Sequence, residues 1–174
     1  MKVIFLDIDG VLNSEEWLDS EEYASNRYIK IDGVPCRNDI NEEHVKNLKD
    51  IVDHTGAKIV LCSTWRHIAF YHSPSIHLNH TLNHILNKYG LSIMDKIGNT
   101  KPPSFIRPKE IKCWLDNHAD VESFVILDDD YNHDEYDMYG IAKHLVQTQF
   151  YGKDGGLQLS HVSKAIKILE NDWS

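Results

Sequence analysis

The chain has few cysteines and no long apolar run. Cys36, Cys62 and Cys113 are odd in number, far apart and in no paired motif. We therefore expect neither a disulfide framework nor a structural zinc site, and a reducing cytosol fits best. The apolar run near the N-terminus is too short for a signal peptide and is interrupted by Asp7, and no stretch is long enough to span a bilayer. These absences predict a cytoplasmic protein without a membrane partner.

Basic residues are also scarce. The chain has 18 Lys and Arg residues against 27 Asp and Glu residues, which gives a formal net charge of −9. This balance argues against a non-specific nucleic-acid binder with a basic surface, although one local basic pocket would be enough to accept a nucleic-acid end. The sequence has no evident repeat, low-complexity tract or Pro/Gly-rich linker, so we expect a single domain over residues 1–174.

The first twelve residues combine an apolar strand with two carboxylates. Residues 3–6 form an unbroken apolar run, typical of a strand buried on both faces in a parallel sheet. Asp7 and Asp9 follow it two residues apart, so both can address one point, and Gly10 allows a sharp turn. Two close carboxylates repel each other unless a cation lies between them, and Mg²⁺ is the simplest candidate because it prefers oxygen ligands. An acidic strand end that only caps a turn is the alternative.

A later strand repeats this arrangement. The apolar residues 123–127 are followed by Asp128, Asp129 and Asp130. Three like charges at the end of a buried strand are costly unless a cation neutralises them. This second strand end therefore also indicates a metal; a plain acidic loop is the alternative, and two such strand ends in one small domain argue against it.

Helical and strand patterns alternate through the rest of the chain. The predicted helices cover residues 41–55, 67–91 with a break near 73–75, 107–117, and a last helix with Ser160 as its N-cap. Asn41 is a good N-cap for the first of them and Gly56 a good stop. Further strands are predicted over 58–62 and 144–148, and irregular chain over 92–106 and 131–143. Strand–helix units in series predict an α/β fold with a parallel sheet between two layers of helices.

Two segments have open interpretations. The strand over 58–62 runs into Ser63, Thr64 and Arg66; such hydroxyls and an Arg can cradle a phosphate, or they can be a helix cap beside a solvated Arg. Residues 13–40 are polar and aromatic with little periodicity. We interpret them as a lid or flap insertion, with a short helix at about 15–23 and a hairpin at 32–33; a surface loop without a substrate role is the alternative.

Together, these motifs resemble those of the haloacid dehalogenase (HAD) superfamily, in the same order. The motifs are Asp7-Ile-Asp9-Gly10-Val-Leu, the strand ending in Ser63-Thr64, Arg107-Pro-Lys109 at a helix start, and Asp128-Asp129. More narrowly, the Ser-Thr-Trp-Arg stretch, the Arg-Pro-Lys-Glu-Ile helix and Val-Ile-Leu-Asp-Asp-Asp are similar to the HAD domain of multidomain RNA repair proteins, and in outline to polynucleotide 3′-phosphatases. The resemblance implies a Rossmann-like three-layer α/β/α sandwich with a mostly parallel sheet. Neither gap between motifs is long enough for a large cap domain.

The resemblance also implies roles for the four acids. Asp7 would be the nucleophile that attacks phosphorus and forms an aspartyl-phosphate. Asp9 would protonate the leaving oxygen and then deprotonate the hydrolytic water, and its backbone carbonyl would contact the metal. Mg²⁺ would be held by Asp7 and Asp129, with Asp128 either as a second carboxylate or as the partner of the basic residue.

For the phosphoryl group, the resemblance implies a hydroxyl and a basic residue. Ser63 would hydrogen-bond the phosphoryl group together with the amide of Thr64, but the two hydroxyls compete for this role. Arg107 best fits the basic position, with Lys109 and Lys101 as the other candidates.

The substrate is less constrained by the sequence. An open site without a cap favours a bulky phosphorylated substrate such as a nucleic-acid end, with Arg66 and Lys109 as substrate contacts. The aromatic residues Trp17, Tyr23 and Trp65 are candidates for stacking on a nucleotide. A small-molecule or nucleotide phosphatase is the second hypothesis, and an inactive HAD-like module that binds a partner is the third.

Overall fold

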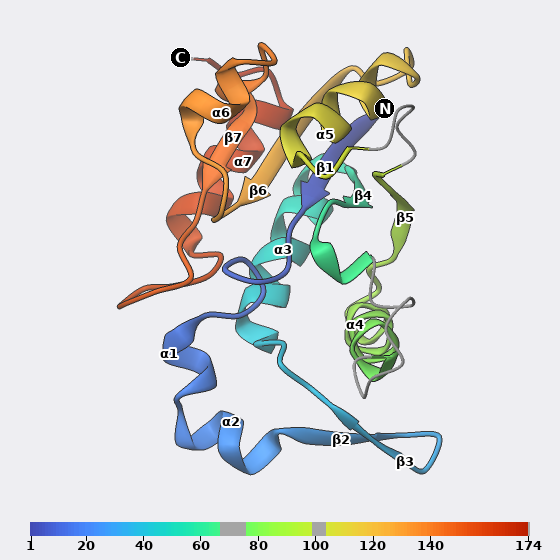
Figure 1. Cartoon of the computed structure of the whole chain (residues 1–174), viewed down its shortest axis with the longest axis vertical. Coiled ribbons are helices and arrows are strands. Elements are labelled where there is room, and N and C mark those ends of the chain that lie inside the picture. Colours follow the sequence, from blue (N-terminus) through green and yellow to red (C-terminus); the bar gives the residue numbers. More distant parts are fainter. Residues whose placement is uncertain (67–75, 99–103, 174) are drawn as a thin grey trace.

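The computed structural model describes residues 1–66, 76–98 and 104–173 and has a five-stranded parallel sheet at its centre (Figure 1). The strand order is β5-β4-β1-β6-β7, and every neighbouring pair is parallel. The strands are β1 (Lys2–Leu6), β4 (Lys58–Leu61), β5 (Ile93–Lys96), β6 (Ser123–Asp128) and β7 (Leu145–Gln147). Because all five run in the same direction, their carboxyl ends meet at one edge of the sheet, where ligands bind in open α/β folds.

The alternation of side chains along β1 places one core on each face of the sheet. Ile4 and Leu6 belong to one buried cluster, whereas Val3 and Phe5 belong to the other. Helices α3 (Glu42–Thr55), α4 (Ile76–Lys88) and α7 (Leu159–Leu169) contribute to the first cluster, and α5 (Arg107–Asp116) and α6 (His133–Asp137) to the second. The predicted α/β/α sandwich is therefore confirmed, and the described residues include no large cap domain.

Local signals account for the clearest boundaries. Asn41 caps α3 by accepting the Glu43 N–H at 3.0 Å, and Gly56 ends the helix with φ at +68°. The predicted cap at Ser160 is wrong, because α7 begins at Leu159. The N-cap is Gln158, two residues before Ser160, and its N–H donates to the His161 ring at 3.0 Å.

Two elements lie where irregular chain was predicted. Strand β5 (Ile93–Lys96) is an edge strand whose residues are mostly exposed, so its sequence carries no buried apolar run. Helix α6 (His133–Asp137) is a single turn that a reciprocal capping box between Asn132 and Glu135 holds in place. Both are too short to give a periodic signal.

The segment over residues 13–40 contains two short helices and a hairpin. Helices α1 (Glu15–Leu18) and α2 (Glu21–Asn26) replace the one helix predicted there, and the antiparallel strands β2 (Tyr28–Ile31) and β3 (Val34–Arg37) extend away from the sheet (Figure 1). Asp32 and Gly33 form the predicted turn with φ of 50° and 82°, as a tight hairpin requires. Among the described residues, no helix has the length and apolar character needed to cross a membrane.

Candidate active site

Asp7 lies at the carboxyl end of β1, beside the end of β6. Its N–H donates to the Leu127 carbonyl at 3.0 Å, and its Oδ1 accepts the Ile8 N–H at 2.8 Å. Burial raises the pKa of Asp7 to about 6, although the charge of Arg107 and a hydrogen bond with Ser63 act in the opposite direction. An ionised Asp7 therefore depends on nearby positive charge.

Arg107, the first residue of α5, supplies positive charge at this point. Its Nη1 donates to Asp7 Oδ2 at 2.6 Å and also to Asp128 Oδ1. The Tyr131 ring lies 5.2 Å from the guanidinium carbon, within the range of a cation–π contact. Pro108 follows in the first helical turn, where its missing N–H leaves no hydrogen bond unmade. One side chain thus joins β1, α5 and β6.

Asp128 and Asp129 complete an acidic cluster with Asp7. One carboxylate oxygen from each of the three lies within 4.8 Å of the others. Asp128 also accepts hydrogen bonds from the Tyr136 hydroxyl and, at 3.0 Å, from the Asp130 N–H. Burial, followed by the charges of Asp7 and Asp128, raises the pKa of Asp129 to about 7.

This set of donors fits a hard divalent cation. Carboxylate oxygens are the ligands that Mg²⁺ prefers, and clustered acids suppress one another's ionisation until a cation offsets their charge. Gly10 allows the cluster to form, because its φ is +73° and a Cβ there would lie 2.1 Å from Asp129 Cγ. Asp128 lies in the cluster and also contacts Arg107, so its position is compatible with both alternatives that the sequence left open.

Asp9 is held by two donors from different parts of the chain. The Trp65 indole N–H donates to its Oδ2 at 2.9 Å, and the Asn13 side-chain amide donates to its Oδ1 at 2.8 Å. Asn13 also accepts the Gly10 N–H at 3.1 Å. The turn that follows β1 and the segment that follows β4 therefore together fix the orientation of the Asp9 carboxylate.

The structure separates the two hydroxyls that follow β4. Ser63 is fully buried, accepts the Trp65 N–H at 3.3 Å and is hydrogen-bonded with Asp7. Thr64 is exposed and lines the cavity above the acids. Ser63 thus lies beside the predicted nucleophile, while Thr64 forms part of the cavity wall.

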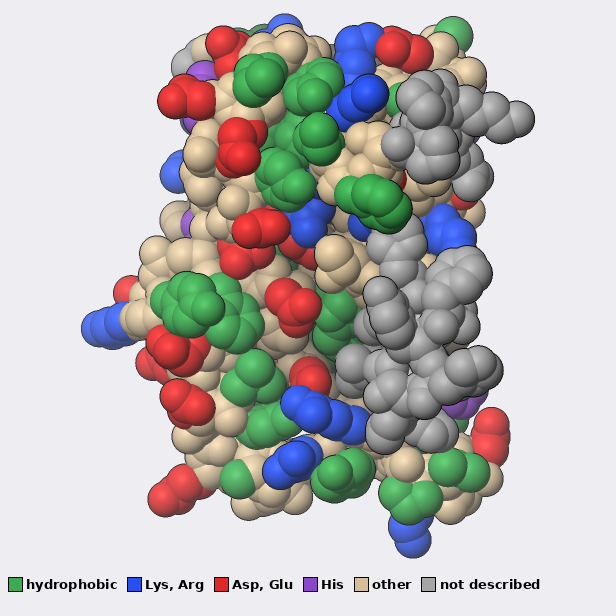
Figure 2. Space-filling model, in the orientation of Figure 1, with side chains coloured by type: hydrophobic (Ala, Val, Ile, Leu, Met, Phe, Trp, Pro, Cys, Tyr) green, Lys and Arg blue, Asp and Glu red, His purple; other side chains and the backbone are tan. Residues whose placement is uncertain are grey.

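A cavity of about 370 Å³ opens over these side chains. Acidic side chains gather near the middle of the face shown in Figure 2, with hydrophobic side chains beside them. The cavity is lined by Asp7, Asp9, Asn13, Leu18, Asp39, Thr64, Arg107, Asp129, Asp130, Phe150 and Tyr151. Three of these residues, Asn13, Leu18 and Asp39, come from the segment 13–40.

Arg66 and Lys109, which were predicted to contact substrate, do not line this cavity. Arg66 is buried: its Nη1 donates to the Cys62 and Ser63 carbonyls at 2.7 Å, and its Nη2 lies 2.6 Å from Glu110 Oε2. Lys109 is exposed on α5. The third basic candidate, Lys101, lies outside the described residues.

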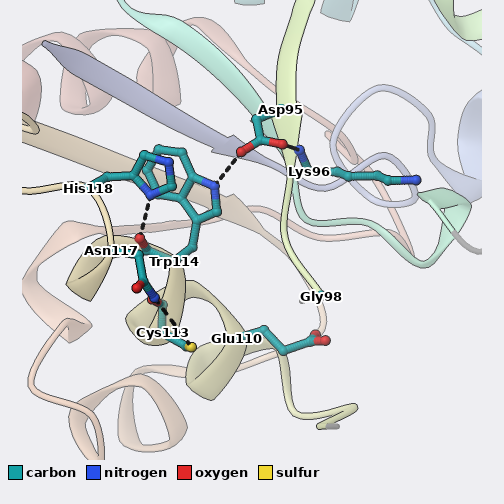
Figure 3. A pocket seen from close by; sticks show the side chains of 8 residues that line it. All are labelled: Asp95, Lys96, Gly98, Glu110, Cys113, Trp114, Asn117 and His118. Atoms are coloured by element: carbon teal, nitrogen blue, oxygen red, sulfur yellow. Dashed lines mark hydrogen bonds between the residues drawn. The ribbon is translucent and has the colours of Figure 1, made fainter. Parts of the chain in front are cut away.

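A second cavity, of about 250 Å³, lies between β5 and α5 (Figure 3). The Trp114 indole donates to Asp95 at 2.7 Å, and His118 stacks on Trp114 with ring centroids 3.6 Å apart. Glu110 lies beside Gly98, whose Cβ, if present, would be 3.6 Å from Glu110 Oε1. None of the acids of the cluster lines this second cavity, so we do not include it in the candidate site.

The aromatic residues proposed for stacking are engaged elsewhere. Trp65 is buried against Asp9, and Tyr23 is buried with its hydroxyl donating to Asp39 at 2.7 Å. Trp17 packs edge-on against Tyr23 with ring centroids 5.9 Å apart and does not line the main cavity. This interpretation of the three residues is therefore not supported by their positions.

Sequence reasoning missed several residues that shape the site. Asn13, four residues after Asp9, and Tyr136, behind Asp128, gave no separate signal because their roles depend on the folded turn and on α6. Phe150 and Tyr151 had a usable signal: they follow β7, and in a parallel sheet such residues reach the same edge as Asp7.

Comparison with known proteins gives one match. A family model described as "HAD domain in Swiss Army Knife RNA repair proteins" matches residues 3–162. Comparisons with curated proteins and with solved structures returned no match. The matched range contains all the residues of the acidic cluster and of the main cavity.

Proposed function

Because the chain belongs to the family of HAD domains in Swiss Army Knife RNA repair proteins, we propose that it is a Mg²⁺-dependent phosphatase acting on a phosphate monoester. The observation that carries the proposal is the acidic cluster: oxygens of Asp7, Asp128 and Asp129 lie within 4.8 Å of one another at the edge of the sheet. Arg107 bonds two of the three. Such a site would hold an anionic phosphoryl group close to the Asp7 carboxylate, although the negative charges of the two groups would otherwise repel each other.

In this proposal, Asp7 attacks phosphorus and forms an aspartyl-phosphate, and the alkoxide leaves with a proton from Asp9. Asp9 then takes a proton from the water that hydrolyses the intermediate and releases phosphate. The Trp65 and Asn13 donors orient Asp9 for both transfers. Asp7 and Asp129, with Asp128 and the Asp9 carbonyl, would hold Mg²⁺, which when bound supplies positive charge that offsets the charges of nucleophile and phosphate.

The remaining contacts to the phosphoryl group come from three residues. Thr64 lines the cavity and the Ser63 side chain lies next to Asp7, which supports contacts of the Thr64 amide and the Ser63 hydroxyl with a phosphoryl group on Asp7. Arg107 keeps its contacts with Asp7 and Asp128 and offsets charge on the intermediate. We assign substrate binding to Thr64, and a structural role to Arg66 because of its buried contacts with Glu110.

For the substrate, we propose a phosphorylated polynucleotide end. The family description names RNA repair, and the cavity is bounded by the 13–40 segment rather than by a large cap. That segment contributes Asn13, Leu18 and Asp39 to the wall, which supports its interpretation as a flap within one domain over residues 1–174. A cytoplasmic location remains part of the proposal.

The reaction is tested by phosphate release from p-nitrophenyl phosphate with and without Mg²⁺. We expect Mg²⁺-dependent release that is abolished in Asp7→Asn. Asp53→Asn, which changes an exposed acid paired with Lys49 on α3, is the matched control and keeps wild-type activity. Equal rates for wild type and Asp7→Asn would overturn the nucleophile assignment.

The substrate class is tested by comparing kcat/KM for a 3′-phosphorylated oligonucleotide and for a nucleoside monophosphate. A higher value for the oligonucleotide supports the strand end. A higher value for the monophosphate would favour a nucleotide phosphatase instead. Absence of hydrolysis of every ester, with the fold intact, would leave the family's inactive binding module as the better description.

A further inference from the structure

The main cavity is lined by two chemically different kinds of side chain. The acids Asp7, Asp9 and Asp129 line it, and so do the aromatic residues Phe150 and Tyr151. Tyr151 is 74% exposed, so most of its side chain is accessible to a bound molecule. The mechanism proposed above uses neither aromatic residue.

The loop that carries the two rings is tied to α1. The Phe150 carbonyl accepts the Glu15 N–H at 2.9 Å, and the Gly152 N–H donates to the Glu15 carboxylate at 3.1 Å. At Gly155, a Cβ would lie 2.6 Å from Ser14 Cβ, so the loop backbone packs directly against the start of α1. These contacts hold the backbone of the loop that carries the aromatic pair in a defined position beside the cavity.

The two rings are arranged edge to face. Their centroids are 5.0 Å apart and their planes lie at 81°, so Phe150 supports the Tyr151 ring on one side without covering all of it. A flat apolar group that enters the cavity with its phosphate toward Asp7 would meet this ring. A nucleotide and a phosphotyrosine have such a flat ring, whereas a phosphorylated serine or glycerol does not, and the RNA repair named in the family description favours the nucleotide.

We propose that Phe150 and Tyr151 form a stacking platform for the nucleobase of the phosphorylated residue. The platform rests on the proposed function, since it places the base relative to a phosphate at Asp7. It also identifies the base as the part of the substrate that the site recognises. The base is recognised through its ring face and not through its hydrogen-bonding edge, so the site tolerates different bases. The same chemistry serves a free nucleotide and a strand end.

The platform is tested by binding, so that the result does not depend on turnover. The Asp7→Asn protein, with and without a change at Tyr151, is titrated into a 5′-labelled, 3′-phosphorylated oligonucleotide, and fluorescence anisotropy gives Kd. Removing one base–aromatic stack weakens binding by about 5- to 150-fold, so we expect a loss of this size for Tyr151→Ala and about twofold or less for Tyr151→Phe.

Two controls are needed to interpret the change in Kd. Tyr28→Ala removes a tyrosine that is 60% exposed on the β2–β3 hairpin and does not line the cavity, and it leaves Kd unchanged. Competition with glycerol phosphate, which has no base, reports phosphate binding alone. Equal Kd values for the Asp7→Asn protein and its Tyr151→Ala form would overturn the platform, as would a Tyr151→Phe loss as large as that of Tyr151→Ala.

The competition measurements also distinguish a free nucleotide from a strand end as the molecule that carries the base. Competition by a nucleoside 3′-monophosphate as strong as that by the unlabelled oligonucleotide supports the platform with a free nucleotide. Stronger competition by the oligonucleotide supports it with a strand end. If the wild-type protein hydrolyses no phosphate ester, the proposed function is refuted, but these binding results do not change. Failure of the proposed function can therefore be distinguished from failure of the platform.

Discussion

The buried ion pair between Arg66 and Glu110 gives the sharpest prediction on stability. Its nitrogen and oxygen are 2.6 Å apart, and the side chains are only 4% and 1% exposed. Removing one partner of such a pair leaves a charge in the interior without compensation, which typically costs about 3–5 kcal/mol. We therefore expect Glu110→Leu to lower the free energy of unfolding by about 3–5 kcal/mol.

Arg66 has further partners, which makes the reverse change informative. Its Nη1 donates to the carbonyls of Cys62 and Ser63 at 2.7 Å. Arg66→Met leaves the Cys62 carbonyl and the Glu110 carboxylate without this donor, whereas the Ser63 carbonyl still accepts the backbone N–H of residue 66 at 3.2 Å; each buried unpaired group adds about 1–3 kcal/mol. The double variant Arg66→Met/Glu110→Leu removes both charges together, so its loss is smaller than the sum of the two single losses.

Urea unfolding of the four proteins measures these free energies. The pair Lys49–Asp53 is the matched control: its atoms are 2.8 Å apart, but the side chains are 39% and 54% exposed. Breaking such a surface pair changes stability by only about 0.2–1 kcal/mol. A loss below about 1 kcal/mol for Glu110→Leu, or additive single losses, would refute the argument that burial makes this pair essential.

Three further predictions concern the metal, the turn after β1 and pH. We expect Mg²⁺ to raise the melting temperature of the wild type. Asp129→Asn removes one acid of the cluster and abolishes this rise. An equal rise in both proteins would contradict the assigned ligands. Gly10→Ala abolishes phosphatase activity and lowers the melting temperature, because its φ of +73° and a Cβ 2.1 Å from Asp129 are both unfavourable; calorimetry and turnover check this. Burial lowers the pKa of His44 below its ordinary value of 6.5, so the unfolded chain binds more protons than the folded one below that pH, and stability falls as the pH drops. We expect His44→Gln to make the slope of unfolding free energy against pH shallower. An unchanged slope would contradict this expectation.

The acids were predictable from sequence because each pair follows directly after an apolar strand. Asp7 and Asp129 therefore carry a local signal, and the parallel direction of the strands brings them together. Arg66 shows the limit of this reasoning. Its partner Glu110 is 44 residues away along the chain, and nothing near Arg66 distinguishes a buried ion pair from a phosphate contact.

The same limit applies to the rest of the site. Trp65 was expected to be a stacking residue on a nucleotide, but its buried indole donates to Asp9. In strand β5 only Ile93 packs against the core and the other three residues are exposed, so the sequence has no apolar run by which the strand could be recognised. Burial and pairing across the fold decide these roles, and neither is encoded in a short window of sequence.

The position of β1 has a consequence for synthesis of the protein. This strand is the first in the sequence but the middle one in the sheet, and its two neighbours are β4 and β6. While the ribosome is still making residues beyond Leu61, one edge of β1 has no neighbour, and an unpaired apolar edge invites association with other chains. The nascent chain acquires both flanks of its central strand only after Asp128 has emerged, so we expect chaperones to engage it before that stage.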